Sequence, residues 1–213
     1  MLRIVVLVSG GGTNLQALID AQHAGKIKNG KITCVISSKE GAFALERARR
    51  AGIEAKTVAR KLYASAEEYD AVLLAVLQEC RADLIVLAGF MSILGSSVTD
   101  RYANRIINVH PALIPSFCGK GYYGLRVHEA ALSYGVKVTG ATVHFVNNIP
   151  DGGAIILQKA VAIQSGDTPE ILQRRVMEQA EWKILPQAVS LFCEGRIHVN
   201  GNRTEIISEE EIQ

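Results

Sequence analysis

The chain has 213 residues, of which 48% are hydrophobic, and its formal net charge is +2 at pH 7. This length favours a single globular domain over 1–213, and the lack of a long basic run disfavours nucleic acid or an anionic membrane as a partner. The start shows no signal-peptide pattern, the apolar stretches are too short to span a bilayer, and the four cysteines are widely spaced, so we expect a cytoplasmic protein with reduced thiols.

The first predicted elements are a strand, a glycine turn and a helix. Residues 3–9, RIVVLVS, form a β-branched run of strand length, and three glycines follow at 10–12. Apolar residues then recur at helical spacing. Thr13 and Gln16 fit a capping box, so we expect the Thr13 side chain to cap this helix.

Strands and helices continue to alternate as far as residue 135. In the predicted strand 83–89, every residue after Asp83 is apolar, as expected of a parallel strand covered on both faces. The alternation implies a parallel sheet with right-handed crossovers. The other predicted strands are 32–38, 54–58 and 105–110, and the predicted helices are 42–52, 66–80 and 124–135.

The pattern changes at residue 136. Two long strand-like runs, 136–146 and 154–163, flank a turn-rich segment and predict an antiparallel hairpin. Thr168 as N-cap and Pro169 at the first position open a long helix, which Pro186 should kink or end. We assign no function to the acidic tail SEEEIQ.

These elements predict an α/β fold with one open, mostly parallel, Rossmann-like sheet. Helices should cover both faces, and the C-terminal antiparallel hairpin should extend the sheet. In such sheets ligands bind outside the carboxyl ends of the strands. Candidate functional residues are therefore sought at strand ends.

The glycine loop SGGGTNLQ lies between the first strand and the first helix. Its backbone can approach an anion, and the helix N-terminus offers unpaired amides, so it suits a phosphate. Leu15 stands where a dinucleotide fingerprint needs a glycine, and no Gly-Lys-Ser/Thr follows. A small monophosphate remains as the ligand; alternatively, the loop is a tight turn that binds nothing.

Two polar residues end the apolar run RIINVHP. Residues two apart in a strand share a face, so Asn108 and His110 should point the same way, and Pro111 holds His110 extended. An amide beside an imidazole can stabilise an oxyanion and move a proton. The alternative is a strand end whose polar groups bond only to nearby backbone.

Thr142 and His144 repeat this spacing in GATVHFV, and Asp151 follows in a turn rich in proline and glycine. Locally, a structural histidine and an ordinary Asp-Gly turn also explain these residues. No histidine pair has helical ligand spacing and the cysteines are scattered, so we predict no metal site. Nothing around Cys118 indicates an activated thiol.

Taken together, SGGGTNL, LAGFM, NVHPALIPSF, TGATVHFV, DGGAIILQ and EWKILP resemble the phosphoribosylglycinamide formyltransferases, folate-dependent enzymes of purine synthesis. The resemblance covers nearly the whole chain. It implies formyl transfer from 10-formyltetrahydrofolate, as co-substrate, to the glycyl amine of glycinamide ribonucleotide. We expect small-molecule partners only, no metal, and a monomer or homodimer.

The resemblance also implies roles for individual residues. Asn108 would bind the formyl oxygen, His110 would stabilise charge and transfer protons, and Asp151 would orient the protonated His110, with Thr142 and His144 in support. The ribonucleotide would contact Gly12, Thr13, Asn14 and Glu181. The folate would contact Met91, Ser92, Ile93, Leu94, Val146, Asn147, Asn148, Ile149 and Pro150.

The chain departs from that family pattern at three positions. Ala66 stands where many members have an arginine near the folate tail, so either Arg60 or Lys61 replaces that contact or the contact is missing. Trp182 and Cys118 stand where a histidine and a proline are common. The alternatives are a folate-dependent formyltransferase that acts on another amine and a non-catalytic nucleotide-binding module.

Overall fold

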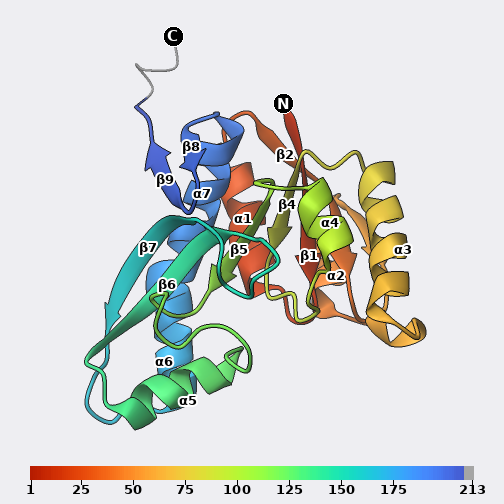
Figure 1. The fold of residues 1–213 in the computed structure, drawn as a ribbon. Coiled ribbons are helices and arrows are strands. Elements are labelled where there is room, and N and C mark those ends of the chain that lie inside the picture. The colour runs from red at the N-terminus through yellow and green to blue at the C-terminus, as the bar shows by residue number, and fades with distance from the viewer. Residues whose placement is uncertain (209–213) are drawn as a thin grey trace.

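The computed structural model describes residues 1–208, and most of the strands in this range belong to one twisted sheet (Figure 1). The order of its seven strands is β3-β2-β1-β4-β5-β6-β7. The first five strands along the chain run parallel, while β6 pairs antiparallel with both β5 and β7. These strands are β1 Leu2–Val8, β2 Gly30–Ser37, β3 Glu54–Thr57, β4 Leu84–Leu87, β5 Ile106–His110, β6 Val138–Phe145 and β7 Ile155–Ala162.

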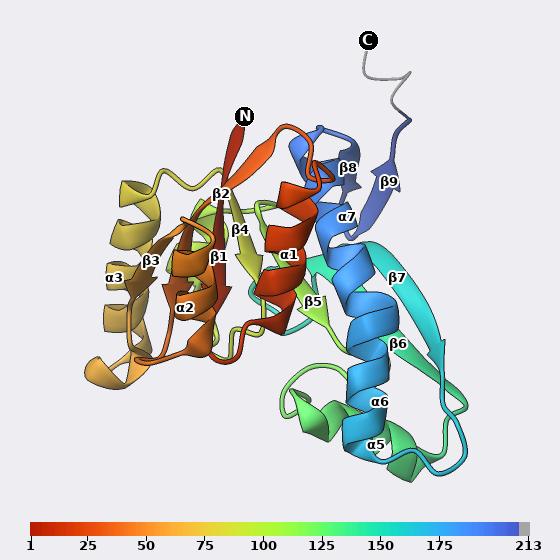
Figure 2. The same cartoon turned by 180° about the vertical axis from the view of Figure 1, so that it is seen from behind.

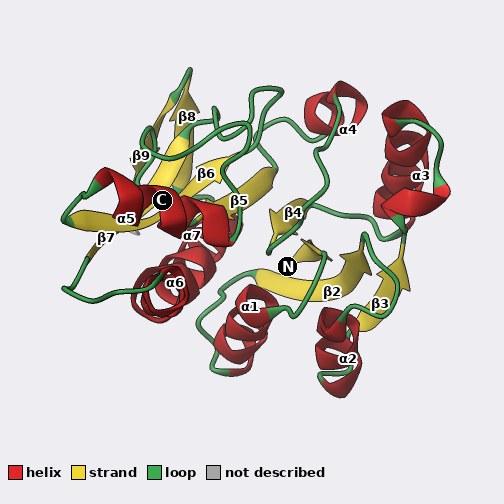
Figure 3. Cartoon of the chain, turned by 90° about the horizontal axis from the view of Figure 1, so that it is seen from below, coloured by secondary structure: helices red, strands yellow, loops and turns green. Residues whose placement is uncertain are grey.

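The helices cover both faces of the sheet. Seen from behind, α1, α2, α6 and α7 lie over one face (Figure 2), and the view from below shows α3 and α4 on the other (Figure 3). α5 packs against α6. The helices are α1 Thr13–His23, α2 Phe43–Arg50, α3 Ala66–Glu79, α4 Ser96–Arg101, α5 Leu125–Tyr134, α6 Pro169–Val176 and α7 Trp182–Cys193, with short turns η1 Arg60–Leu62 and η2 Met177–Glu181.

The predicted fold class and the predicted strands and helices are confirmed. The sequence did not reveal α4, η1 or the small hairpin of β8 Ile197–Asn200 and β9 Arg203–Ile206. These elements are only three to six residues long, too short for a periodic pattern to stand out. Only Ser208 of the acidic tail lies within the described residues.

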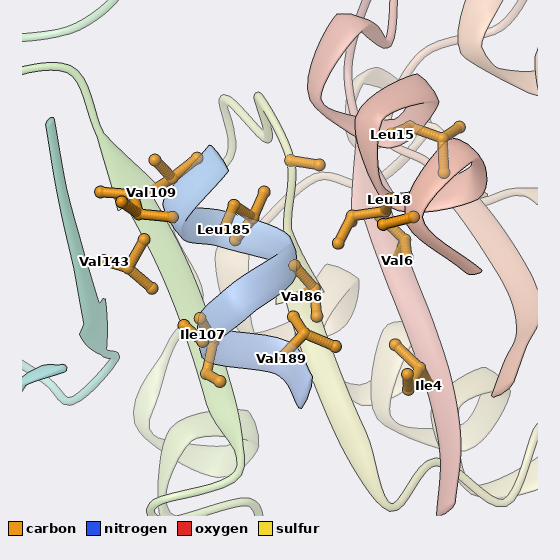
Figure 4. Close-up of a cluster of buried hydrophobic side chains, with 14 of the residues drawn as sticks. Ile4, Val6, Leu15, Leu18, Val86, Ile107, Val109, Val143, Leu185 and Val189 are labelled. Atoms are coloured by element: carbon orange, nitrogen blue, oxygen red, sulfur yellow. The ribbon is translucent and has the colours of Figure 1, made fainter. Parts of the chain in front are cut away.

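The core consists of two hydrophobic clusters separated by the sheet. Alternate residues of β1 contribute to each: Val6 lies in the cluster under α1 and α7, and Val5 in the cluster under α3. In the first cluster, Leu185 and Val189 of α7 lie among side chains of β4, β5 and β6 (Figure 4). Both faces of the parallel strands are therefore buried, which explains their continuous apolar sequences.

The two helix starts singled out in the sequence behave differently. The Thr168 side chain accepts a hydrogen bond from the Ile171 amide at 3.3 Å, so its predicted capping of α6 is confirmed. The prediction for Thr13 is wrong: Gly12, in the left-handed conformation, is the N-cap of α1, and no side chain caps this helix. Thr13 is already inside the helix, because the glycine loop makes its last turn at residue 12.

Pro186 does not end the last long helix, contrary to one of the two predicted outcomes. It lies inside α7, which continues to Cys193. The irregularity lies earlier, in the π-helical turn Met177–Glu181 between α6 and α7. Because proline has no backbone N–H, α7 lacks one intrahelical hydrogen bond at Pro186. None of the described helices is long and apolar enough to cross a membrane.

Candidate active site

Strand pairing brings four polar side chains together at the end of β5. In the antiparallel register, Asn108 lies opposite His144 and His110 lies opposite Thr142. Thr142 and His144 are almost fully buried, and His110 is 4% exposed. The residues that strand parity placed on one face of each strand therefore form a single cluster across two strands.

Hydrogen bonds determine the tautomer of His144. Its Nδ1 lies 2.7 Å from the carbonyl oxygen of Phe145, an acceptor, so Nδ1 must carry a proton. In the neutral ring, Nε2 then accepts from the Asn108 side-chain amide, 3.2 Å away. This contact identifies which Asn108 atom is the nitrogen and leaves its second N–H for another acceptor.

His110 is held in the same way by a carbonyl group. Its Nε2 lies 2.8 Å from the Phe117 carbonyl oxygen and donates to it, so the lone pair of the neutral ring is on Nδ1. Nδ1 faces Asp151 Oδ2 at 3.6 Å. Burial holds the pKa of His110 below its usual range, although the Asp151 carboxylate and the Phe117 carbonyl oppose this shift. The neutral ring can therefore accept a proton at Nδ1.

Asp151 reaches this cluster from the loop after β6. Its Oδ1 is 3.6 Å from His144 Nε2, and its Oδ2 accepts a hydrogen bond from the Gly119 amide at 2.8 Å. Burial alone would raise the pKa of Asp151, but His144, the charge on protonated His110 and the Gly119 amide together hold this pKa below its usual range. The side chain is therefore an anion that faces both histidines.

The conformation of the Asp151 loop depends on the two glycines that follow. A Cβ atom at Gly153 would lie 1.8 Å from the Phe145 carbonyl oxygen, and one at Gly152 would lie 2.6 Å from the Ile149 side chain. Asp151 itself has a φ of 54°, in the left-handed region. The Asp-Gly-Gly sequence is therefore needed for this close approach as well as for a turn.

Thr142 fixes the segment that follows His110. Its hydroxyl donates to the Ala112 carbonyl oxygen at 2.7 Å and accepts from the Ile114 amide at 3.0 Å. The side chain of Gln158 in β7 donates to the same hydroxyl at 3.0 Å. Thr142 thus supports the loop that carries the Phe117 carbonyl.

Cys118 is close to Asp151 but is not an activated nucleophile. Its thiol donates to the Pro115 carbonyl oxygen at 3.2 Å. Burial, followed by the negative charge of Asp151, raises the pKa of this thiol. The thiol is therefore mostly protonated near neutral pH.

The glycine loop meets the N-terminus of α1 as predicted. Gly12 has a φ of 73°, and a Cβ atom there would lie 2.6 Å from the Ala44 Cβ of α2. Arg47, which the sequence did not single out, donates to the Gly11 carbonyl oxygen at 2.9 Å. The first-turn amides of α1, from Thr13 and Asn14, are thus presented beside a cation.

Asn14 and Glu181 are 167 residues apart in sequence but are hydrogen-bonded. Asn14 Nδ2 donates to Glu181 Oε2 at 2.7 Å, and both side chains are buried. Burial raises the pKa of Glu181 to about 7, although the hydrogen bond from Asn14 opposes this rise. The π-helical turn before α7 therefore places a carboxyl group against the glycine loop.

The large groove of the structure is lined by a residue of the glycine loop but not by the expected catalytic residues. A groove of about 920 Å³ between α1 and α7 is lined by Thr13, Arg47 and Trp182, among others. Asn108, His110 and Asp151 do not line it. Because the titratable cluster lies around the end of β5, we place the candidate chemistry there and not in the groove.

The segment expected to form an apolar wall, residues 91–94, follows β4. Met91 is 49% exposed and Ile93 is 80% exposed, while Leu94 is buried. The Met91 amide donates to Ser9 Oγ at 2.8 Å, which ties the segment to the end of β1. Two large apolar side chains are thus available to a ligand at the carboxyl edge of the sheet.

Residues 146–150 lie beside α4. The Val146 amide donates to the Ile106 carbonyl oxygen at 2.9 Å. Asn148 is hydrogen-bonded to Thr99, and it donates to Asp100 at 3.0 Å. Asn147 accepts from the Ile149 amide at 2.9 Å within the loop. The two asparagine side chains therefore hold this loop in place. The Ile149 side chain is exposed.

The three unusual positions differ in their surroundings. Arg60 donates to the Tyr63 carbonyl oxygen at 3.0 Å, and Lys61 pairs with Glu40 at 2.7 Å, so each cation already has one partner and keeps further N–H donors for an anion. Ala66 is the first residue of α3. The indole N–H of Trp182 is buried and has no hydrogen-bond partner among the described residues.

Sequence reasoning missed the groups that the backbone supplies. The Phe117 carbonyl and the Gly119 amide lie in a loop, and side-chain patterns carry no signal for them. His128 of α5 was also missed: it is fully buried, and neither of its ring nitrogens has a partner among the described residues. Burial, followed by the charge on His110, lowers the pKa of His128 to about 4.

The cluster combines an amide donor, two imidazoles and one carboxylate. Such a set can stabilise developing negative charge and transfer protons, which suits attack of a nucleophile on a carbonyl group. Because neither a thiolate nor an activated serine accompanies it among the described residues, the nucleophile is best supplied by a substrate.

Comparisons with known proteins agree on one family. A family model described as formyl transferase matches residues 2–189. The chain is 44% identical over 202 residues to the phosphoribosylglycinamide formyltransferase of Haemophilus influenzae, covering 95% of this chain and 92% of that protein. It is 43% identical over 201 residues to the protein of the same name from Escherichia coli, covering 94% and 92%. The structure of glycinamide ribonucleotide transformylase 1 from Symbiobacterium toebii matches with a TM-score of 0.92 and 45% identity, covering 98% of this chain and 95% of that one.

Proposed function

This chain belongs to the formyl transferase family, and we propose that it transfers a formyl group from 10-formyltetrahydrofolate to the amine of N1-(5-phospho-D-ribosyl)glycinamide. The products are the N2-formyl ribonucleotide and tetrahydrofolate, in purine biosynthesis. The observation that carries the proposal is the position of Asp151, 3.6 Å from both His110 Nδ1 and His144 Nε2. The names of the relatives support this choice of acceptor.

In the proposed reaction, Asn108 stabilises the charge on the formyl oxygen. The substrate amine attacks the formyl carbon, and the oxygen becomes negative as the tetrahedral intermediate forms. Asn108 donates its second amide N–H to this oxygen, while its first N–H remains bonded to His144. His144 thereby orients the amide before the substrates bind.

His110 and Asp151 handle the protons. Nδ1 of the neutral His110 accepts a proton from the amine, directly or through a water molecule, because Nε2 is committed to the Phe117 carbonyl. The Asp151 carboxylate stabilises the imidazolium that results and helps return a proton to the folate nitrogen as it leaves.

The ribonucleotide binds at the glycine loop. The backbone amides at Gly12, Thr13 and Asn14 hold its phosphate at the N-terminus of α1, and Glu181 contacts its ribose. The Asn14–Glu181 hydrogen bond supports this assignment, because it links the two binding elements before the substrate arrives.

The folate supplies the formyl group and lies across the carboxyl edge of the sheet. Its pterin packs against Met91 and Ile93, with Ser92 and Leu94 completing that wall. The backbone of residues 146–150 provides hydrogen bonds. The exposure of Met91 and Ile93 supports this fit, since apolar walls with backbone hydrogen bonds suit a flat heteroaromatic ligand.

The proposal also covers the setting of the enzyme. We infer that the described residues act as one domain. The two hydrophobic clusters lie on opposite faces of a single sheet, and the same strands contribute side chains to both. We expect a monomer or homodimer that is located in the cytoplasm and acts on small-molecule substrates. The free cysteines among the described residues fit a reducing compartment.

An assay of 10-formyltetrahydrofolate consumption, run with and without glycinamide ribonucleotide, tests the proposal. We expect consumption only with the ribonucleotide, together with formation of its N-formyl product. Consumption without it would identify a deformylase. No consumption in either case would favour a nucleotide-binding module, and consumption only with a different amine would identify another acceptor.

A further inference from the structure

Two cysteines and a glutamate that are distant in sequence meet at one edge of the sheet. Cys34 of β2 and Glu54 of β3 are direct neighbours in the parallel register, so their side chains share a face. α3 covers that face, and Cys80, the residue at its C-terminal cap, completes the group. One Sγ atom from each cysteine and one carboxylate oxygen of Glu54 all lie within 4.8 Å of one another.

These separations are close to those of a zinc site. With Zn–S near 2.3 Å and Zn–O near 2.0–2.2 Å, the ligand atoms of a tetrahedral site lie roughly 3.5–3.8 Å apart. The 4.8 Å limit exceeds this spacing by only about 1 Å, so metal binding would require only small side-chain movements. Thiolate ligands select soft or borderline cations, so calcium and magnesium are disfavoured.

The charges around the group suit a bound divalent cation. Two thiolates and one carboxylate around Zn²⁺ carry a net charge of −1. Lys56, two residues after Glu54 on the same face, offsets this charge; its Nζ lies 3.4 Å from Glu54 and 2.9 Å from Glu79.

A cation can reach this group from solvent, and the group lies away from the candidate active site. Cys34 and Cys80 are buried, but β3 is the edge strand and the Glu54 side chain is 58% exposed. A cation can enter beside Glu54, and water can occupy the fourth ligand position. Glu54 is the first residue of β3, so the group lies toward the amino ends of the strands, whereas the candidate active site lies at the carboxyl ends.

We propose that Cys34, Cys80 and Glu54 form a binding site for one thiophilic divalent cation of the zinc type, which cross-links α3 to β2 and β3. Binding forms two metal–sulfur bonds and one metal–oxygen bond and releases two protons from the thiols to solvent. Neither sulfur is oxidised or reduced. Binding therefore stabilises the native state, because the unfolded chain does not hold the three ligands together.

Titration of the freshly reduced, metal-free protein with Co²⁺ tests the site. We expect one equivalent to bind and to give a thiolate-to-cobalt charge-transfer band in the near ultraviolet. Cys34→Ala and Cys80→Ala should each abolish this band. Cys193→Ala, which removes a buried thiol outside the group, should retain it. No band in the wild-type protein, or a band that persists in both variants, would overturn the proposal.

A second measurement applies even if a buried variant fails to fold. Glu54→Gln changes an exposed side chain and should weaken Co²⁺ binding by about tenfold or more. Zn²⁺ should raise the melting temperature of the wild-type protein and of Cys193→Ala. Unchanged Co²⁺ affinity in Glu54→Gln, no thermal shift with Zn²⁺, or a Cys34–Cys80 disulfide in freshly purified protein by mass spectrometry would each contradict the site.

Discussion

At the scale of single residues, carbonyl and amide groups determine which atoms face the substrate. Strand parity placed Asn108 and His110 on one face from the sequence alone. It did not reveal that the Phe117 carbonyl occupies His110 Nε2 or that His144 orients the Asn108 amide. Both contacts join residues that come together only when the chain folds. The roles of these side chains are therefore best tested by single substitutions.

Asn108→Ala and His110→Ala should each reduce kcat by ~100-fold or more, because each removes a group that acts on developing charge. The dissociation constant of the ribonucleotide should change little, since neither side chain belongs to the glycine loop. Steady-state kinetics and calorimetry measure the two quantities. Asn202→Ala and His198→Ala, at exposed positions in the β8–β9 hairpin, are the matched controls. Near-wild-type turnover in either site variant would contradict the mechanism.

Glu181 makes stability depend on pH. Its pKa is about 7 in the folded protein and near 4.5 when exposed, so between these pH values the native state holds a proton that the unfolded chain releases. The stability from the protonated carboxyl group is fully present below pH 4.5 and is lost as pH rises through 7. Glu181→Gln should remove this loss, which is on the order of 3 kcal/mol.

Urea denaturation at pH 5 and pH 8 measures the effect of Glu181. Gln keeps an oxygen that can accept from Asn14, so the variant should fold. Glu178→Gln alters an exposed carboxyl group in the same π-helical turn and should follow the wild-type profile. If Glu181→Gln loses as much stability as the wild type between these pH values, the carboxyl group does not titrate in this range.

At the scale of elements, the strand–glycine–helix unit at the N-terminus combines a correct prediction with a wrong one. The periodicity of the sequence correctly predicted where the strand and the helix lie. The expected Thr13 cap was wrong because Gly12 takes the left-handed conformation at that point. A glycine is needed there for two reasons: the positive φ and the closeness of α2.

Gly12→Ala should lower the free energy of unfolding by roughly 1–3 kcal/mol and raise KM for the ribonucleotide. The new methyl group would meet Ala44 and displace the first-turn amides of α1. Gly11→Ala is the matched control for stability, because nothing lies within 4 Å of its Cβ position and its φ is not positive. Equal unfolding free energies in the two variants would show that the position of Gly12 carries no special constraint.

At the scale of the whole molecule, one sheet organises both the core and the candidate site. α7 packs its buried side chains on β4, β5 and β6 and follows directly on the turn that carries Glu181. Packing of this helix therefore supports the strand that carries Asn108 as well as the carboxyl group at the glycine loop.

Leu185→Ala should lower the free energy of unfolding by about 2–5 kcal/mol, because Leu185 is fully buried in the cluster between α7 and the sheet. Leu62→Ala removes the same atoms from a side chain that is 66% exposed and should change stability by no more than ~0.5 kcal/mol. Urea denaturation compares the two variants. A loss at Leu185 as small as that at Leu62 would mean that α7 is not part of the cooperative core.

The sequence by itself determined the longer elements, their alternation and the polar residues at strand ends. These features depend on local periodicity and on residue preferences, which involve only residues close together in the sequence. The tertiary structure alone decided three contacts: His144 beside Asn108, Glu181 beside Asn14, and Cys80 beside Cys34 and Glu54. Each joins residues more than 25 positions apart, and such pairs form only when strand register and helix packing are complete.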